Sequence, residues 1–245
     1  MKYVIIGGGL TGLTLTHSLH RNNHEVVLIE SSETLGGRFR TEANELAFIG
    51  PTPESFGALE WLKAISPTPL NWHEEDNQPL FFESHEWQHF LGFGDFPSTV
   101  VNELSFFNQS NQVILEPGLD QVTRSLIEQL PIEARMHAEV TGFEHSNGRI
   151  QGVIVNDHEK ITGDAFIFCP SPLKLNDLLH GEILKPSSRT RIAKQHAWTA
   201  VTLTLVHKEP VLTSPALRFV LGTGKEFEPI VGRVWPTHSV WLNLV

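Results

Sequence analysis

The first 30 residues change their hydrophobic pattern twice. Residues 3–6 form a short run rich in β-branched side chains, which suits a buried strand, and three glycines follow it. Residues 10–20 place leucines at spacings that suit a helix packed on a sheet. Residues 25–30, with the sequence EVVLIE, again have the pattern of a buried strand. The order strand, helix, strand predicts a β-α-β unit.

Farther along, the pattern alternates between helix and strand signals. A turn followed by a helix is predicted for residues 51–62, whereas residues 67–96 are rich in aromatic residues, Pro and His without a long period and suggest an insertion. An amphipathic segment at residues 122–130 follows Gly118. Strands are predicted at residues 138–143, 149–156, 164–168 and 199–207, with a hairpin turn at Asn147-Gly148 between the first two. These elements predict an α/β protein.

Composition limits the classes of function. With 245 residues, of which 40% are apolar, the chain can bury a substantial core. A net charge of -10 with scattered Lys and Arg disfavours nucleic acid as a partner. We find no signal peptide and no run long enough to span a membrane, so we expect a soluble, cytoplasmic protein that acts on a small-molecule substrate. The single cysteine, Cys169, excludes an internal disulfide and is expected to be a packed core thiol.

The glycines after the first strand form a dinucleotide-binding pattern. In the spacing G-x-G-x-x-G, the first glycine permits a tight turn, the second lets a pyrophosphate approach the backbone, and the third lets helix and strand pack closely. The pattern follows a strand and opens a helix, which is the context it requires. The phosphates would lie on the helix N-terminus. The candidate cofactor-binding residues here are Gly7, Gly9, Leu10, Thr11 and Gly12.

An acidic residue ends the second strand. Glu30 lies eighteen residues beyond Gly12, where its carboxylate can accept hydrogen bonds from an adenosine ribose. A contact of this charge-assisted kind contributes roughly 1.5–3 kcal/mol. A carboxylate at this position also disfavours a 2′-phosphate, so NADP is the least expected dinucleotide.

The segment from Glu30 to Thr41, ESSETLGGRFRT, resembles the segment that follows the ribose acid in flavin amine oxidases, protoporphyrinogen oxidases and phytoene desaturases. The resemblance implies FAD as cofactor. The glycine pair lets a loop pass close to the cofactor, and Arg38 offers a guanidinium to phosphate. The candidate contacts added by this segment are Ser31, Gly36, Gly37 and Arg38.

Three shorter segments extend the resemblance. Gly50-Pro51-Thr52 is similar to the family segment that passes near the flavin ring, which makes Thr52 a candidate contact. Val140 occupies the place where the family's strand supplies backbone contacts to adenine. Residues 165–170 resemble the strand that returns beside the cofactor.

The resemblance implies an architecture and an activity. It implies an FAD/NAD(P)-binding Rossmann-like domain from residues 1–66 and 111–172. Residues 67–110 and 173–245 would form a second, partly antiparallel substrate-side domain that is discontinuous and incomplete. The implied activity is that of an FAD-dependent oxidoreductase, amine-oxidase-like, with hydride transfer from an amine or related donor to flavin. Family members continue past this length, and the late Gly-Asp motif has no counterpart after Val220, so we expect a fragment or a naturally short relative.

Two other functions stay open from the sequence. The first is a short nucleotide-binding module that holds ADP, AMP or NAD without redox turnover. The second is a zinc hydrolase, because the sequence HEWQH at residues 85–89 matches the zinc-peptidase pattern H-E-x-x-H. On a helix, His85 and His89 would bind zinc and Glu86 would act as general base. The flanking residues instead predict a strand, in which the two histidines would lie about 13 Å apart and could not bind one ion. No metal ligand is therefore assigned. The resemblance stops before the second half of the family's chain, which carries much of the chemistry, so no catalytic residue is assigned either, and the oligomeric state is left open.

Overall fold

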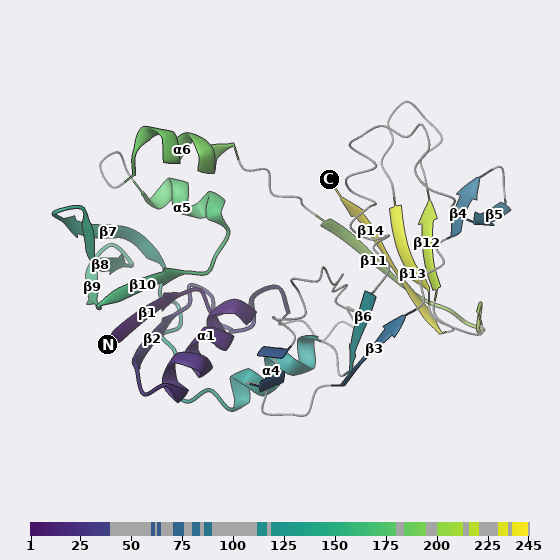
Figure 1. The fold of residues 1–245 in the computed structure, drawn as a ribbon, viewed down its shortest axis with the longest axis horizontal. Coiled ribbons are helices and arrows are strands. Elements are labelled where there is room, and N and C mark those ends of the chain that lie inside the picture. The colour runs from purple at the N-terminus through teal and green to yellow at the C-terminus, as the bar shows by residue number, and fades with distance from the viewer. Residues whose placement is uncertain are drawn as a thin grey trace. The chain divides into compact units, whose positions relative to one another are not determined.

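The computed structural model describes most of the N-terminal and middle parts of the chain and the strands elsewhere (Figure 1). The described residues are 1–39, 60–61, 63–64, 71–75, 80–83, 86–89, 112–116, 119–179, 184–194, 200–212, 216–220, 230–234 and 237–244. The chain divides into two compact units, which we describe separately. Unit 1 comprises residues 1–43, 61–70 and 119–197, and unit 2 comprises residues 44–60, 71–118 and 198–245. The domain boundaries expected from the sequence stay a prediction.

Unit 1 is built on a parallel three-stranded sheet. The strand order is β10 (Ala165–Phe168), β1 (Lys2–Ile6), β2 (Glu25–Ile29), and β1 pairs in parallel with both neighbours. Helix α1 (Leu10–Arg21) connects β1 to β2 (Figure 1). The predicted β-α-β unit and the α/β fold class are therefore confirmed.

Both faces of this sheet are covered, because successive side chains of a strand point to opposite faces. Ile5 is fully buried on the α1 face, where its Cγ2 atom lies 3.5 Å from the position of an added Gly12 Cβ. Val4 and Ile6 instead belong to a core cluster with residues of a β-meander. The complete buried cluster is Val4, Ile6, Ile29, Ala138, Val140, Val153, Val155 and Ile161.

The meander consists of β7 (Val140–Ser146), β8 (Arg149–Val155) and β9 (Glu159–Thr162), all antiparallel. Its first turn contains Asn147 and Gly148 at φ values of 53° and 71°, the left-handed conformation that tight hairpin turns require. The hairpin predicted at Asn147-Gly148 is confirmed.

Helices complete unit 1. The predicted amphipathic segment forms α4 (Leu119–Glu128), whose Val122 and Leu126 are fully buried. The buried His17 ring contacts the Leu126 carbonyl through Nε2 at 2.8 Å and so joins α1 to α4, which lie side by side (Figure 1). Helices α5 (Pro172–Leu178) and α6 (Pro186–Ala193) follow β10. Among the described residues, no helix is long and apolar enough to cross a membrane.

Unit 2 contains a six-stranded sheet. Its order is β11 (Ala200–Val206), β14 (His238–Leu244), β13 (Ile230–Val234), β12 (Ala216–Val220), β4 (Leu80–Glu83), β5 (Glu86–His89). All pairs are antiparallel except β12 with β4. The strand predicted at residues 199–207 is confirmed as β11, which pairs antiparallel with β14. A separate pair, β3 (Asn71–Glu75) with β6 (Gln112–Glu116), is antiparallel.

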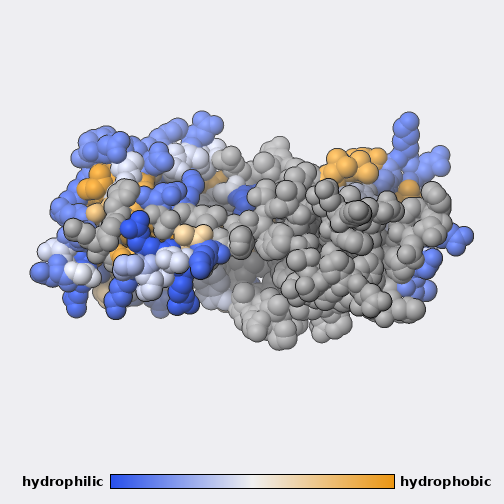
Figure 2. Space-filling view, turned by 90° about the horizontal axis from the view of Figure 1, so that it is seen from above, coloured by the Kyte–Doolittle hydropathy of each residue, from blue (hydrophilic) through white to orange (hydrophobic). Residues whose placement is uncertain are grey.

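Apolar side chains reach the surface of unit 2 along β11. Leu203 is 56% exposed, Leu205 44% and Val206 83%. Separate orange areas in the space-filling view mark hydrophobic residues exposed on this face of the molecule (Figure 2). This strand is an edge of the described sheet.

Candidate functional site

The loop between β1 and α1 has the conformation that a dinucleotide-binding turn needs. Gly7 adopts φ 98°, in the left-handed region that favours glycine, and its N–H donates to the Ile29 carbonyl at 2.8 Å. A Cβ at Gly12 would lie 1.9 Å from the Gly7 carbonyl oxygen, so only glycine lets the helix pack this closely. The first and third glycines of the motif therefore have the roles that the sequence suggests.

The N-terminus of α1 is available to an anion. Gly9 is the N-cap residue, no side chain caps the helix, and its first turn carries no acidic residue. The first helical hydrogen bond runs from the Leu13 N–H to the Gly9 carbonyl at 2.9 Å, which leaves the N–H groups of Leu10, Thr11 and Gly12 without helical acceptors. Unpaired N–H groups and the helix dipole attract negative charge to this end.

The second glycine pair lies against this turn. The Gly36 N–H donates to the Gly8 carbonyl at 2.8 Å, and Gly36 and Gly9 form an isolated parallel bridge. Gly37 adopts φ 57°, and a Cβ placed on it would lie 3.0 Å from the Gly9 Cα. The structure thus brings together two glycine motifs that are far apart in sequence. Arg38 follows in the 3-10 turn η1 (Gly37–Phe39), where it is exposed and forms no ion pair with a described residue.

The Glu30 carboxylate is held beside the same turn. Its Oε2 accepts the Gly8 N–H at 2.7 Å, and its Oε1 accepts the Ser32 N–H at 2.8 Å and the Ser31 hydroxyl at 3.3 Å. Partial burial raises the pKa of Glu30, but the hydrogen bonds from Ser32, Gly8 and Ser31 outweigh it and lower the pKa below its ordinary value. Glu30 is therefore an ionised, oriented acceptor at neutral pH.

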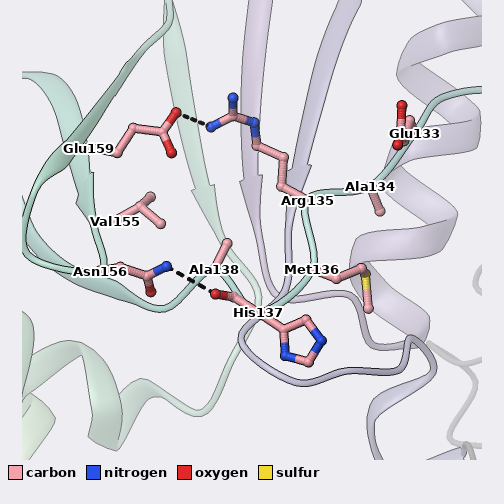
Figure 3. A pocket seen from close by; sticks show the side chains of 9 residues that line it. All are labelled: Glu133, Ala134, Arg135, Met136, His137, Ala138, Val155, Asn156 and Glu159. Atoms are coloured by element: carbon pink, nitrogen blue, oxygen red, sulfur yellow. Dashed lines mark hydrogen bonds and ion pairs between the residues drawn. The ribbon is translucent and has the colours of Figure 1, made fainter.

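Residues 133–138 run beside the end of β2 and line a pocket of about 610 Å³ (Figure 3). The Glu30 N–H donates to the Arg135 carbonyl at 2.9 Å, and the Ala138 N–H donates to the Glu30 carbonyl at 2.9 Å. On the other side of the pocket, Arg135 forms an ion pair with Glu159. The lining residues are Glu133, Ala134, Arg135, Met136, His137, Ala138, Val155, Asn156 and Glu159. Val140, the predicted adenine contact, begins β7 with its side chain in the core.

Sequence reasoning missed several residues of this site. Gly8 is one, because a Cβ there would lie 2.4 Å from the Leu35 side chain and 3.2 Å from Glu30 Oε2. Ser32 is another, because its N–H holds the carboxylate. The run of glycines at residues 7–9 was a signal for Gly8, whereas a serine after the acidic residue is too common to indicate the role of Ser32.

Other predicted positions do not join the site. Thr52 lies outside the described residues, as does His85 of the HEWQH motif. Glu86–His89 form strand β5, so the predicted strand is confirmed and the helix that a zinc peptidase requires is absent from these residues. No group of metal-binding side chains occurs in the part of the chain that the structure describes.

Cys169 lies next to the glycine turn, at the end of β10. Its N–H donates to the Ile6 carbonyl at 2.9 Å, and the thiol is free and partly buried. Burial raises the pKa of Cys169, which keeps the thiol protonated and poorly nucleophilic.

The residues present fit a dinucleotide. A Cβ added to Gly9 would meet only the Gly37 Cα, at 3.8 Å, so the bare backbone of Gly9 keeps open a space that a side chain would fill. That opening lies at the uncapped N-terminus of α1. The Glu30 carboxylate is close to it, because it accepts the N–H of Gly8, the residue before Gly9. Anion-binding N–H groups beside a fixed carboxylate match the phosphate and ribose of a nucleotide.

Comparison with known proteins agrees with this geometry. Residues 5–54 match the NAD(P)-binding Rossmann-like domain family. An L-amino acid oxidase from Cerastes cerastes is 43% identical over 54 residues, which are 20% of this chain and 10% of that oxidase. An L-amino acid oxidase from Bothrops pictus is 32% identical over 88 residues, 33% of this chain and 18% of that one. The chain therefore covers less than a fifth of the length of these oxidases.

Solved structures resemble the whole chain. An oxidoreductase from Methanosarcina mazei gives a TM-score of 0.69 at 15% identity, covering 100% of this chain and 79% of that chain. Putrescine oxidase bound to putrescine also gives 0.69, at 12% identity, covering 100% of this chain and 76% of that chain. The predicted resemblance to the flavin amine oxidases is confirmed for the fold. The family match at residues 5–54 and the shared fold of the whole chain together show a Rossmann-like fold in this chain.

Proposed function

We propose that this chain binds FAD through unit 1 and serves an FAD-dependent oxidoreductase of the amine oxidase kind. One observation carries the proposal: the Glu30 carboxylate is fixed 2.7 Å from the Gly8 N–H, beside the uncapped N-terminus of α1. A ribose acceptor and a phosphate site are thereby adjacent, as the ADP half of FAD needs.

The pyrophosphate would lie on the first turn of α1. The backbone N–H groups of Leu10, Thr11 and Gly12 supply donors, and Gly9 supplies the close approach. Arg38 is exposed just after the glycine pair that contacts Gly9, and its guanidinium would add a charged contact to phosphate. Gly7, Gly36 and Gly37 keep the two loops close enough for both contacts.

The adenosine would lie beyond the end of β2. Glu30 would accept the ribose hydroxyl groups, with Ser31 next to it, and the Val140 backbone would contact adenine. Thr52 is assigned to the flavin side from the family resemblance alone. These assignments follow the family residue by residue.

The flavin, when bound, supplies hydride acceptance from an amine or related donor. Residues of this chain bind the cofactor, fix its ribose and phosphates, and shield it from water. Following the family resemblance, unit 2 is proposed as the substrate-side domain. L-amino acid oxidase and putrescine oxidase among the similar proteins favour an amine or amino acid as donor.

A second function is favoured by a specific observation. Every contact described in unit 1 addresses the ADP half of the cofactor, so the chain could hold ADP, AMP or NAD without redox turnover. Flavin affinity separates the two functions, because only the first requires contacts beyond the pyrophosphate.

Titration of the purified chain with FAD and with ADP, by calorimetry and by absorption from about 300 to 550 nm, tests the proposal. We expect FAD to bind more tightly than ADP and Glu30→Ala to weaken both at least tenfold, in line with roughly 1.5–3 kcal/mol for a charge-assisted hydrogen bond. Glu25→Ala is the matched control, because this carboxylate lies at the start of β2, the strand that Glu30 follows, and contacts Lys2 at the surface. Equal affinity for ADP and FAD would favour the second function, and no binding of either would refute both.

A further inference from the structure

Asn156 fastens the turn between β8 and β9 to the segment that holds Glu30 (Figure 3). Its Nδ2 donates to the His137 carbonyl at 3.0 Å, and its Oδ1 accepts the Glu139 N–H at 2.9 Å. The Asn156 N–H donates to the Glu139 carbonyl at 2.8 Å. Both ends of one side-chain amide are therefore used on the backbone of residues 137–139.

The fastened segment controls where the Glu30 backbone lies. Glu30 follows the end of β2, and its N–H and carbonyl are bonded to Arg135 and Ala138. The His137 N–H donates to the Ser32 carbonyl at 3.1 Å, and Ser32 in turn holds the Glu30 carboxylate. His137 thus connects Asn156 to the Glu30 loop: its N–H donates to Ser32, and its carbonyl accepts from Asn156.

This link has a backbone conformation that needs support. His137 adopts φ 52°, which a residue with a Cβ rarely occupies. The carbonyl bond to Asn156 and the N–H bond to Ser32 hold it there. Asn156 and Asp157 have φ values of 50° and 64° and form the tight turn, so Asn156 combines a turn role with a clamping role.

We propose that Asn156 is a positioning residue of the nucleotide site, which acts by holding residues 137–139 and, through them, the Glu30 carboxylate toward the ribose. This inference rests on the proposed nucleotide-binding function. The Arg135–Glu159 ion pair joins the start of β9 to a residue just before this segment, but both side chains are about half exposed, so the ion pair adds little to the positioning.

A matched pair of variants separates the two roles of Asn156, its side-chain hydrogen bonds to residues 137 and 139 and its positive φ in the turn. Asn156→Gly keeps a residue suited to positive φ and removes the amide. Asn147→Gly makes the same change in the β7–β8 turn, where Asn147 has φ 53° and an exposed side chain. We expect Asn156→Gly to weaken ADP binding about fivefold, in line with the loss of hydrogen bonds, and Asn147→Gly to leave it unchanged.

The preference for ribose gives a readout that a purely structural role would not move. Wild-type protein should bind ADP more tightly than 2′-deoxy-ADP, and Asn156→Gly should reduce this ratio because Glu30 no longer meets the 2′-hydroxyl in one position. If Asn156→Gly weakened the binding of both ligands equally, or of neither, the proposed positioning role of Asn156 would be overturned. Absence of ADP binding by the wild-type protein would instead overturn the proposed function.

Asn156→Asp keeps the test decisive if Asn156→Gly does not fold, as judged by circular dichroism and thermal melting. The aspartate retains an acceptor for the Glu139 N–H and tolerates positive φ, but it cannot donate to the His137 carbonyl. We expect the ADP to 2′-deoxy-ADP ratio to fall here as well. An unchanged ratio in a folded Asn156→Asp protein would overturn the proposal.

Discussion

Strands β2 and β11 are both short, apolar and five to seven residues long, yet they have opposite surroundings. Leu28 in β2 is fully buried, whereas Leu203 in β11 is 56% exposed. In unit 1, α1 covers one face of the parallel sheet and the meander covers the other. In unit 2, four consecutive residues of β11, 203–206, are exposed.

The difference shows where this chain can hold a ligand precisely in place. The candidate site lies at the end of β1 and β2, where packing on both faces fixes the backbone and leaves the loops little freedom. At β11, exposed side chains and an edge position leave the strand open to partners rather than shaped for a small ligand.

Gly12→Ala should have the largest effect. Its Cβ would lie 1.9 Å from the Gly7 carbonyl oxygen, a backbone atom that cannot move without opening the turn. We expect a loss of about 3 kcal/mol in the free energy of unfolding, measured by urea denaturation. Gly142→Ala is the control, since its Cβ would meet only Ile154 at 4.0 Å. Equal losses for the two variants would show that close packing at Gly12 is not the cause.

Leu28→Ala and Leu203→Ala compare the two strands with one chemical change. Removing a fully buried leucine leaves a cavity and costs about 3 kcal/mol. Removing the 56% exposed Leu203 should cost under about 0.5 kcal/mol. Urea denaturation of both variants measures the difference, and similar losses would mean that β11 is covered in solution.

Sequence alone could predict the local part of the site. The glycine spacing and the pattern of residues 3–30 indicate the strand, the turn, the helix and the acid, because these depend on neighbours in sequence. The residues that flank the HEWQH motif predict a strand rather than a helix, and Glu86–His89 form β5.

What sequence could not predict depends on contacts between distant segments. The bond from the Gly36 N–H to the Gly8 carbonyl, and those from residues 135–138 to Glu30, follow from how the loops fold back. Asn156 was predicted only as the end of a strand, although Asn-Asp is a tight-turn signal. Its side-chain contact with residues 137 and 139 required the tertiary structure.

The pH dependence of stability tests whether the Glu30 carboxylate is held as described. The pKa of Glu30 is lowered in the folded protein. The ionised carboxylate therefore stabilises the fold at pH values above 4.5, its pKa in the unfolded chain, and this stabilisation is lost as the pH falls through the lowered pKa. The stability difference between wild type and Glu30→Gln should therefore be largest near neutral pH and vanish well below pH 4.5. Urea denaturation across this range measures it, with Glu25→Gln as the control for removing one charge from β2. A difference independent of pH would contradict the hydrogen-bonded carboxylate.

Val206→Lys should have the smallest effect on stability and a visible effect on association. Val206 is 83% exposed at the end of an edge strand, so the change in unfolding free energy should stay within about 0.5 kcal/mol. A lysine on an exposed edge disfavours strand pairing between molecules, so light scattering on heating or concentration should rise later than in wild type. Val211→Lys is the control, because Val211 is 54% exposed but lies outside the strand. If both lysines delay scattering equally, added charge rather than the β11 edge explains the effect, and the contrast between the two units loses its support at β11.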